Sequence, residues 1–367
     1  MGIFCCGRLQ RRWAASSEQK VQGVPQRVRL RAFYSCVLAH RLFARPRYEL
    51  PIEIGLSYFR YNSLNGKNRN RKPEPETRKH ITCALNQISL SQIFAGRSWL
   101  IMGILNVTPD SFHDGGRFRS FDAAVEWAGA MARAGAAIID VGGESTRPWS
   151  EPVGVDEELE RVIPVIEALA GSFNLPVSVD TSKAEVARRA LDAGAAMIND
   201  VTAFRGDPAM AAVAAEAGCP VCLMHMLGKP RTMQDNPSYR EVIGDIADFF
   251  RRRIDFALSH GVRRENIILD PGIGFGKTVE HNLAVISRLD EFASLGRPLM
   301  VGASRKRFIG TIAAEEDTGR RLPGTISANV LALRNGASVF RVHDVAENFQ
   351  ALKVAAAILK SGRGGRR

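Results

Sequence analysis

The sequence predicts an α/β fold, a (β/α)8 TIM barrel that follows a basic N-terminal extension. From about residue 80, short runs that are apolar throughout alternate with longer Ala-, Leu- and Glu-containing runs of helical composition. Uniformly apolar strands are typical of a parallel sheet that helices cover. The chain contains eight such runs, and eight β-α units in about 260 residues fit the usual size of one barrel.

The composition is that of a chain that folds around a hydrophobic core. Of 367 residues, 45% are hydrophobic and 24% are charged, which excludes a wholly disordered, collagen-like or coiled-coil chain. An open doubly wound sheet is the rival fold, because it is built from the same βαβ unit. The count of eight strands, and the absence of a Gly-rich dinucleotide turn after the first one, favour the barrel.

The charge divides the chain into a basic extension and a nearly neutral body. Residues 1–98 hold 18 Lys and Arg against 5 Asp and Glu, whereas residues 99–367 have a net charge of −1. A nucleic-acid binder usually spreads its basic side chains over one face of the fold, so we predict no nucleic-acid partner. The expected regions are a basic, disordered extension over 1–79, an N-terminal hairpin over 80–98, the barrel over 99–360 and a basic tail over 361–367.

The origin of the extension stays open on the sequence. Gly2 with Cys5 and Cys6 could be lipidated, the Arg-rich, acid-poor stretch resembles a transit peptide, and translation could instead begin downstream. No apolar run reaches 18 residues, so no membrane span is predicted. Six cysteines are too few for a disulfide scaffold and suggest a reducing, cytoplasmic setting. We expect Cys219 and Cys222 to be buried thiols rather than metal ligands.

The elements are expected in alternating order along the chain. The predicted strands are Leu100–Asn106, Ala137–Val141, Val177–Asp180, Met197–Asp200, Val221–His225, Ile267–Asp270, Leu299–Ser304 and Ser338–Val342. The clearest predicted helices are Asp122–Ala134, Lys183–Ala193 and Asp207–Ala217. Each ends near a glycine, at Gly135, Gly194 and Gly218, where a helix terminus often needs a left-handed residue.

Polar residues gather at the ends of the predicted strands. They are Asn106, Asp180, Asn199 with Asp200, His225, Asp270, and Ser304 with Arg305 and Lys306. In a barrel these positions surround the C-terminal opening, where active sites of this fold are built. Strand-end Asp and Asn also cap helices or begin turns, which would explain any one of them. Six together suggest a pocket for a small polar ligand.

Two further motifs concern phosphate. The run Asp270–Thr278 resembles a P-loop, but the required glycine position holds Pro271, so we reject a nucleotide site. The eighth strand ends with Arg341 and His343, which alternate and therefore point to the same side. Because loops after the seventh and eighth barrel strands commonly bind phosphate, this pair is a candidate anion site.

Taken together, these motifs resemble the dihydropteroate synthases of the pterin-binding (β/α)8 family. The resemblance covers about residues 98–360. It depends on segments that occur in order, one per barrel unit: 102–116, 138–148, 178–181, 198–201, 224–226, 270–277, 304–306 and 341–345. The first, second and sixth are long enough to be specific individually.

The resemblance implies a transferase of folate biosynthesis. It would condense a dihydropterin methyl diphosphate with 4-aminobenzoate, giving dihydropteroate and diphosphate. It assigns the pterin to Asp180, Asn199, Asp270 and Lys306, with Lys306, Asp110 and Arg147 in catalysis. The carboxylate of Asp270 suits the 2-amino and N3-H donors of a pterin.

The resemblance also assigns the second half of the site. Diphosphate would bind Thr146, Arg341, Val342 and His343, and Asn106 would ligate Mg²⁺, a hard cation that takes oxygen ligands. The residues implied for 4-aminobenzoate are Phe275, Arg305, Pro148 and Phe112. The loops 107–120 and 142–156 would close over it.

Two rival functions would use parts of the same sequence. A pterin-dependent methyltransferase shares the pterin pocket but should lack Arg341, His343 and the E-S-T-R-P loop. A nucleic-acid or membrane-associated protein would act through the basic extension instead. The resemblance implies a homodimer whose partners are small molecules only.

Overall fold

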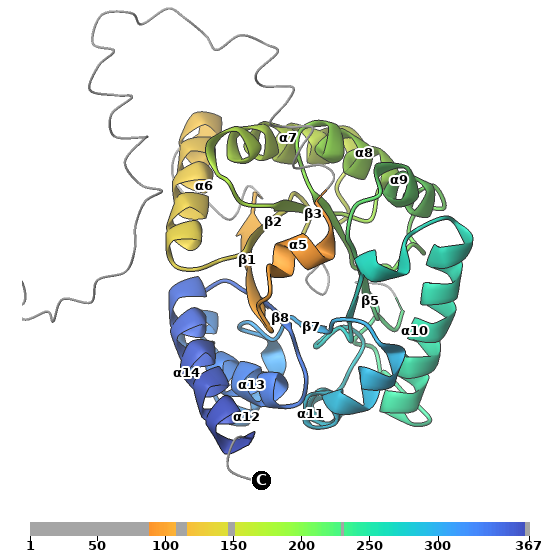
Figure 1. Cartoon of the computed structure of the whole chain (residues 1–367), viewed down its shortest axis with the longest axis vertical. Coiled ribbons are helices and arrows are strands. Elements are labelled where there is room, and N and C mark those ends of the chain that lie inside the picture. The colour runs from red at the N-terminus through yellow and green to blue at the C-terminus, as the bar shows by residue number, and fades with distance from the viewer. Residues whose placement is uncertain (1–87, 108–115, 146–150, 229–230, 364–367) are drawn as a thin grey trace, which may run out of the picture. The chain divides into compact units, whose positions relative to one another are not determined.

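The eight strands form one parallel sheet that curves into a barrel with helices around it (Figure 1). A computed structural model describes residues 88–107, 116–145, 151–228 and 231–363, all in one compact unit of the chain. The strands are β1 (Leu100–Asn106), β2 (Ile138–Gly142), β3 (Val177–Asp180), β4 (Met197–Asp200), β5 (Val221–Met224), β6 (Ile267–Asp270), β7 (Met300–Val301) and β8 (Val339–Val342). They pair in the order β6-β5-β4-β3-β2-β1-β8-β7.

The sheet closes between β6 and β7, which confirms the barrel and excludes the open doubly wound sheet. Leu269 and Leu299 form an isolated parallel bridge. The backbone N–H of Leu269 also donates a hydrogen bond to the carbonyl oxygen of Pro298 at 3.0 Å. Every residue of β2 to β6 is buried, as expected for strands covered on both faces.

Helices separate the strands along the chain. They are α6 (Gly116–Arg133), α7 (Val155–Ser172), α8 (Ala184–Asp192), α9 (Met210–Ala217), α10 (Val242–Ser259), α11 (Val279–Ser287), α12 (Arg307–Ala313), α13 (Leu322–Arg334) and α14 (Val345–Arg363). The three glycines expected after helices have positive φ. At Gly135, φ is 107° and an added Cβ would lie 2.7 Å from the ring of Phe349. None of the described helices is long and apolar enough to cross a bilayer.

Where the sequence predicted a hairpin over 80–98, the described part of that range forms a helix instead. Helix α5 (Leu90–Phe94) begins with a capping box: Gln92 N–H donates to Ser89 Oγ at 3.3 Å, and Ser89 N–H to Gln92 Oε1 at 2.7 Å. Residues 80–87 lie outside the described residues. The reciprocal Ser-x-x-Gln pattern explains why this short segment turns into a helix.

Helix α5 closes the barrel at the end where the strands begin. Its buried residues Leu90 and Ile93 pack in one cluster with Leu100, Met102 and Met300 from the starts of strands. Figure 1 shows α5 lying across the ring of strands. Apolar side chains fill this end of the barrel. The polar residues at the strand ends lie at the opposite end, which we call the mouth.

Candidate active site

Strand ends place the predicted polar side chains together at the mouth. Asp180 and Asp270 are the last residues of β3 and β6, Asn199 is the second last of β4, and His225 follows β5. None of the four is more than 7% exposed. Buried polar groups require partners, and the partners define the geometry of the site.

Arg341 joins two buried carboxylates across the barrel. Its Nε donates to Oδ2 of Asp140 and its Nη2 donates to Oδ2 of Asp180, each at 2.6 Å. Asn199 Nδ2 donates to the same oxygen of Asp140 at 3.0 Å. Burial raises the pKa of Asp180 to about 7, although Arg341 opposes the rise. Burial alone would lower the pKa of Arg341, but the two carboxylates raise it above its usual range.

Asp270 is held by the glycine-rich turn that follows it. Gly272 N–H donates to Asp270 Oδ1 at 2.7 Å, which turns the other oxygen, Oδ2, toward Gly302. Burial raises the pKa of Asp270. Gly272 has φ of 69°, and an added Cβ would lie 2.0 Å from the carbonyl oxygen of His225. Only glycine fits a turn that approaches the neighbouring backbone so closely.

Lys306 and Phe275 face each other above this turn. The Nζ atom of Lys306 lies 4.1 Å from the centre of the Phe275 ring, a cation–π distance. Arg305, which has φ of 57°, instead turns to Asp344, donating from Nε to Oδ2 at 3.0 Å. The structure thus brings Phe275 and Lys306 together, whereas the guanidinium of Arg305 is paired with the carboxylate of Asp344.

His343 is fixed by a neighbouring strand end. Its Nδ1 lies 2.9 Å from Ser304 Oγ, and its backbone N–H donates to the same oxygen at 3.2 Å. Burial, together with the charge of Arg341, lowers the pKa of His343 to about 3. The ring is therefore neutral at physiological pH. Val342, which precedes it in β8, is fully buried.

Asn106 ends β1 beside this group. A Cβ added to Gly142 would lie 3.7 Å from both Asn106 Oδ1 and Asp180 Oδ2, so the amide oxygen is near the carboxylate. The remaining predicted site residues lie outside the described residues. They are Asp110, Phe112, Thr146, Arg147 and Pro148.

Asp200 has a structural role, as the turn-forming alternative anticipates. Its Oδ1 accepts from the backbone N–H and hydroxyl of Thr202, and its Oδ2 accepts from the N–H of Phe204, all at 2.7 Å. Both carboxylate oxygens therefore have partners within the turn after β4. Cys219 and Cys222 are buried as predicted, and burial raises the pKa of both thiols.

The sequence did not predict a place in this region for two buried charged residues, Asp140 and Lys277. Asp140 stands inside β2 rather than at its end, and the signal was a charged residue within the apolar run I-I-D-V. Lys277, only 3% exposed, donates from Nζ to the carbonyl oxygen of Phe275 at 3.1 Å and lies 2.9 Å from His225 Nδ1. Burial lowers the pKa of Lys277 to about 7 and that of His225 to about 2.

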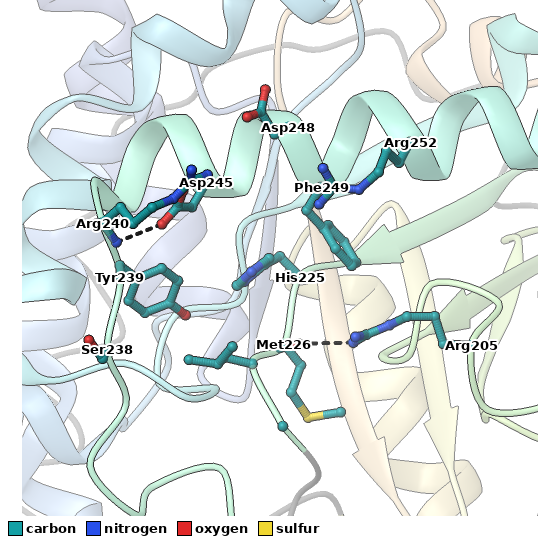
Figure 2. Close-up of a pocket in the computed structure, with 12 residues that line it drawn as sticks. Arg205, His225, Met226, Ser238, Tyr239, Arg240, Asp245, Asp248, Phe249 and Arg252 are labelled. Carbon is teal, nitrogen blue, oxygen red and sulfur yellow. Dashed lines mark hydrogen bonds and ion pairs between the residues drawn. The ribbon is translucent and has the colours of Figure 1, made fainter.

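A pocket of about 330 Å³ opens beside β5 and α10. Figure 2 shows His225 between Tyr239 and Phe249, with Arg205 and Arg252 on the same side of the pocket as Phe249. Of the strand-end residues described, only His225 contributes to its lining. The buried charged groups converge at the mouth instead, which makes the mouth the candidate active site.

Comparisons with known proteins show the family of this chain. The family model described as pterin binding enzyme matches residues 102–343. A dihydropteroate synthase of Synechocystis sp. is 49% identical over 263 residues, covering 72% of this chain and 91% of the relative. A solved Xanthomonas albilineans dihydropteroate synthase with 4-aminobenzoic acid is 44% identical, with a TM-score of 0.68, covering 71% of this chain and 93% of that one.

The same likeness extends to a second solved structure. Dihydropteroate synthase from Xanthomonas albilineans in complex with 7,8-dihydropteroate is 42% identical to this chain, with a TM-score of 0.66. It covers 71% of this chain and 94% of its own length. These matches show that the chain belongs to the pterin-binding enzyme family and, within it, to the dihydropteroate synthases.

Proposed function

We propose that the mouth of this barrel condenses (7,8-dihydropterin-6-yl)methyl diphosphate with 4-aminobenzoate, giving 7,8-dihydropteroate and diphosphate. The observation that carries the proposal is the buried group of Asp140, Asp180, Asn199 and Arg341, joined by contacts of 2.6–3.0 Å at one end of the barrel. Such a group matches a small ligand that is rich in hydrogen-bonding atoms and carries negative charge at one end.

The pterin ring would bind between the strand ends. Asp270 keeps Oδ2 for the 2-amino and N3-H donors of the ring, because Oδ1 is occupied by Gly272 N–H. Asp180 and Asn199 would serve the remaining ring nitrogens. Lys306 would donate to the ring carbonyl and N5. Each contact is strong when the partner is buried, because losing it leaves an unpaired polar group.

The diphosphate would bind at the ends of β1, β2 and β8. Breaking the bond between the methylene carbon and the diphosphate oxygen develops negative charge on the leaving group, which cations and N–H donors stabilise. Arg341 would supply the positive charge. Neutral His343 would supply a hydrogen bond from Nε2 when the hydroxyl of Ser304 donates to its Nδ1. Thr146 and the backbone at Val342 would complete this half. The arylamine nitrogen then bonds to the methylene carbon and loses a proton.

The donor set fits Mg²⁺ carried with the diphosphate better than a metal bound by protein alone. Among the described residues, no cluster of three His, Cys, Asp or Glu could hold a metal. Mg²⁺ usually keeps several waters and binds one or two protein oxygens together with substrate phosphates. Asn106 Oδ1, close to Asp180, would hold the ion, which would neutralise charge on the leaving diphosphate.

The 4-aminobenzoate would lie above the pterin. Phe275 and the apolar stem of Lys306 offer it a flat apolar contact, and Arg305 offers a cation once it exchanges Asp344 for the benzoate carboxylate. Phe112 and Pro148 would complete the pocket, with Asp110 and Arg147 acting in catalysis from the two loops. A homodimer in the cytoplasm is part of the same proposal.

The test is diphosphate release by the purified full chain. We expect release only when Mg²⁺, the pterin diphosphate and 4-aminobenzoate are all present, with dihydropteroate formed in equal amount. An Asp270→Ala variant with the same thermal unfolding midpoint is the matched control and should be inactive. Folded wild-type protein that releases no diphosphate under these conditions contradicts the proposal.

A further inference from the structure

Asp140 lies one layer deeper in the barrel than the strand-end residues it contacts. In the pairing of β2 with β3, Gly142 stands opposite Asp180, whereas Asp140 stands opposite Ser178, two residues earlier. The side chain is completely buried. It is therefore below the ligand-binding level, where it can act only through other side chains.

One oxygen of Asp140 carries both of its contacts. Oδ2 accepts from Arg341 Nε at 2.6 Å and from Asn199 Nδ2 at 3.0 Å, while Oδ1 has no partner within the described structure. Because an ionised carboxylate only accepts hydrogen bonds, the amide of Asn199 must turn its nitrogen, and not its oxygen, toward Asp140. Arg341 donates to the same oxygen, so both contacts of Asp140 are with hydrogen-bond donors.

This contact fixes which hydrogen-bonding atoms Asn199 keeps for a ligand. An amide has one oxygen acceptor and two hydrogens on nitrogen. With one hydrogen given to Asp140, the carbonyl oxygen and the second hydrogen remain, an acceptor beside a donor. A pterin presents the complement, a 2-amino donor beside the N1 acceptor. The 2-oxo analogue presents the reverse, an oxygen acceptor beside N1–H.

Resting on the proposed function, we infer that Asp140 is a positioning residue that sets the preference of the site for a 2-amino pterin by locking the amide of Asn199. Without the hydrogen bond to Asp140, the amide of Asn199 can rotate by half a turn and contact the 2-oxo analogue as well as it contacts the pterin. Arg341, on β8, holds the carboxylate of Asp140 in place by donating to the same oxygen. Asp270 also disfavours the 2-oxo analogue, and that part of the preference is independent of Asp140.

The experiment measures the dissociation constants of 6-hydroxymethylpterin and its 2-oxo analogue by calorimetry. We expect Asp140→Ala to reduce the wild-type preference for the pterin about tenfold, the effect of one misplaced buried hydrogen bond. Asp140→Asn should restore most of it. Its carbonyl oxygen can occupy the position of Oδ2, and its NH₂ group that of Oδ1, which has no hydrogen-bond partner in the described structure.

The decisive control is the same change in an Asn199→Ala background. There Asp140→Ala should leave the preference unchanged, because the amide it positions is absent. An unaltered preference in Asp140→Ala, a change that persists without Asn199, or an equal loss in Asp140→Asn would each overturn the inference. If Asp140→Ala does not fold, Asp140→Leu removes the acceptor while filling the space. Wild-type protein that binds neither compound contradicts the proposed function instead.

Discussion

Two aspartates that end strands, Asp270 on β6 and Asp200 on β4, differ in how many of their carboxylate oxygens the following turn uses. Asp270 uses one oxygen for the turn and keeps the other at the mouth, whereas both oxygens of Asp200 are taken by Thr202 and Phe204. Both residues are buried. Burial therefore does not distinguish them, but the number of oxygens left for a ligand does.

Replacing each aspartate by asparagine tests this distinction. We expect Asp270→Asn to lower kcat/KM for the pterin diphosphate about 100-fold, because an amide NH₂ then opposes a ligand donor. Asp200→Asn should change kcat/KM less than about twofold but lower the free energy of unfolding by about 1–3 kcal/mol, because a backbone N–H loses its acceptor. Steady-state kinetics and urea unfolding of both variants measure this. Equal losses of activity would contradict the division of roles.

The turn between β6 and α11 is the element on which the site depends most closely. Its glycines allow the chain to pass within contact of β5, and its carbonyl at Gly274 accepts from Gln234 Nε2 at 2.6 Å. Lys277 ties the end of the turn to the buried ring of His225. The turn thus carries Asp270 and Phe275 in positions set by backbone packing.

Gly272→Ala should break this packing. The new methyl group would lie 2.0 Å from the carbonyl oxygen of His225 at φ of 69°, and we expect a loss of about 2–4 kcal/mol in unfolding free energy. Gly296→Ala is the matched control, since its φ of 64° is similar but nothing lies within 4 Å. It should cost about 1 kcal/mol. Similar losses in urea unfolding would show that backbone conformation, not the approach to β5, is decisive.

Sequence patterns predicted the elements better than their ends. The uniformly apolar runs located all eight strands, and β1, β3, β4 and β6 have the predicted bounds. Strand β7 is only Met300–Val301 rather than 299–304, because the chain leaves the sheet at Gly302 toward the left-handed Arg305. Such an exit depends on tertiary contacts that a local pattern does not contain.

The site shows the same limit. Strand-end residues could be found because the fold places every strand end at one mouth. Asp140 and Lys277 could not, because each is defined by partners far away in the sequence, such as Arg341, 201 residues from Asp140. A charged residue inside an apolar run marks such a position, but it does not identify the partner.

At the scale of the whole molecule, the basic extension is predicted to be dispensable for catalysis. The Synechocystis relative matches 72% of this chain yet 91% of its own length, so it has no counterpart of similar size. We expect protein lacking residues 1–79 to keep kcat/KM within about twofold, since the barrel buries its own core. Full-length protein assayed in parallel is the control. Loss of activity in a folded truncated protein would assign the extension a part in the reaction.

The pH dependence of stability is a second property of the whole molecule, and Lys277 should dominate part of it. Burial lowers its pKa from 10.5 to about 7. Between these values the unfolded chain binds a proton that the folded chain lacks, so stability rises with pH. The raised pKa of Asp180 makes stability depend on pH only below about pH 7. The lowered pKa values of His225 and His343 do so only below pH 6.5. Both cysteines act above pH 9.

From pH 7 to 8.5, the free energy of unfolding of the wild type should therefore rise by about 1–2 kcal/mol, near the limit of 1.4 kcal/mol per pH unit for one proton. Lys277→Met should abolish this rise. At pH 7 its loss of stability should be smaller than that expected for a lost hydrogen bond, because the wild type buries a charge at this pH. Lys183→Met is the control, because Lys183 pairs with Glu158 at 2.6 Å and its pKa is raised. It should lower stability equally across this range, as urea unfolding at each pH will show. A rise that survives in Lys277→Met would mean that another group titrates here.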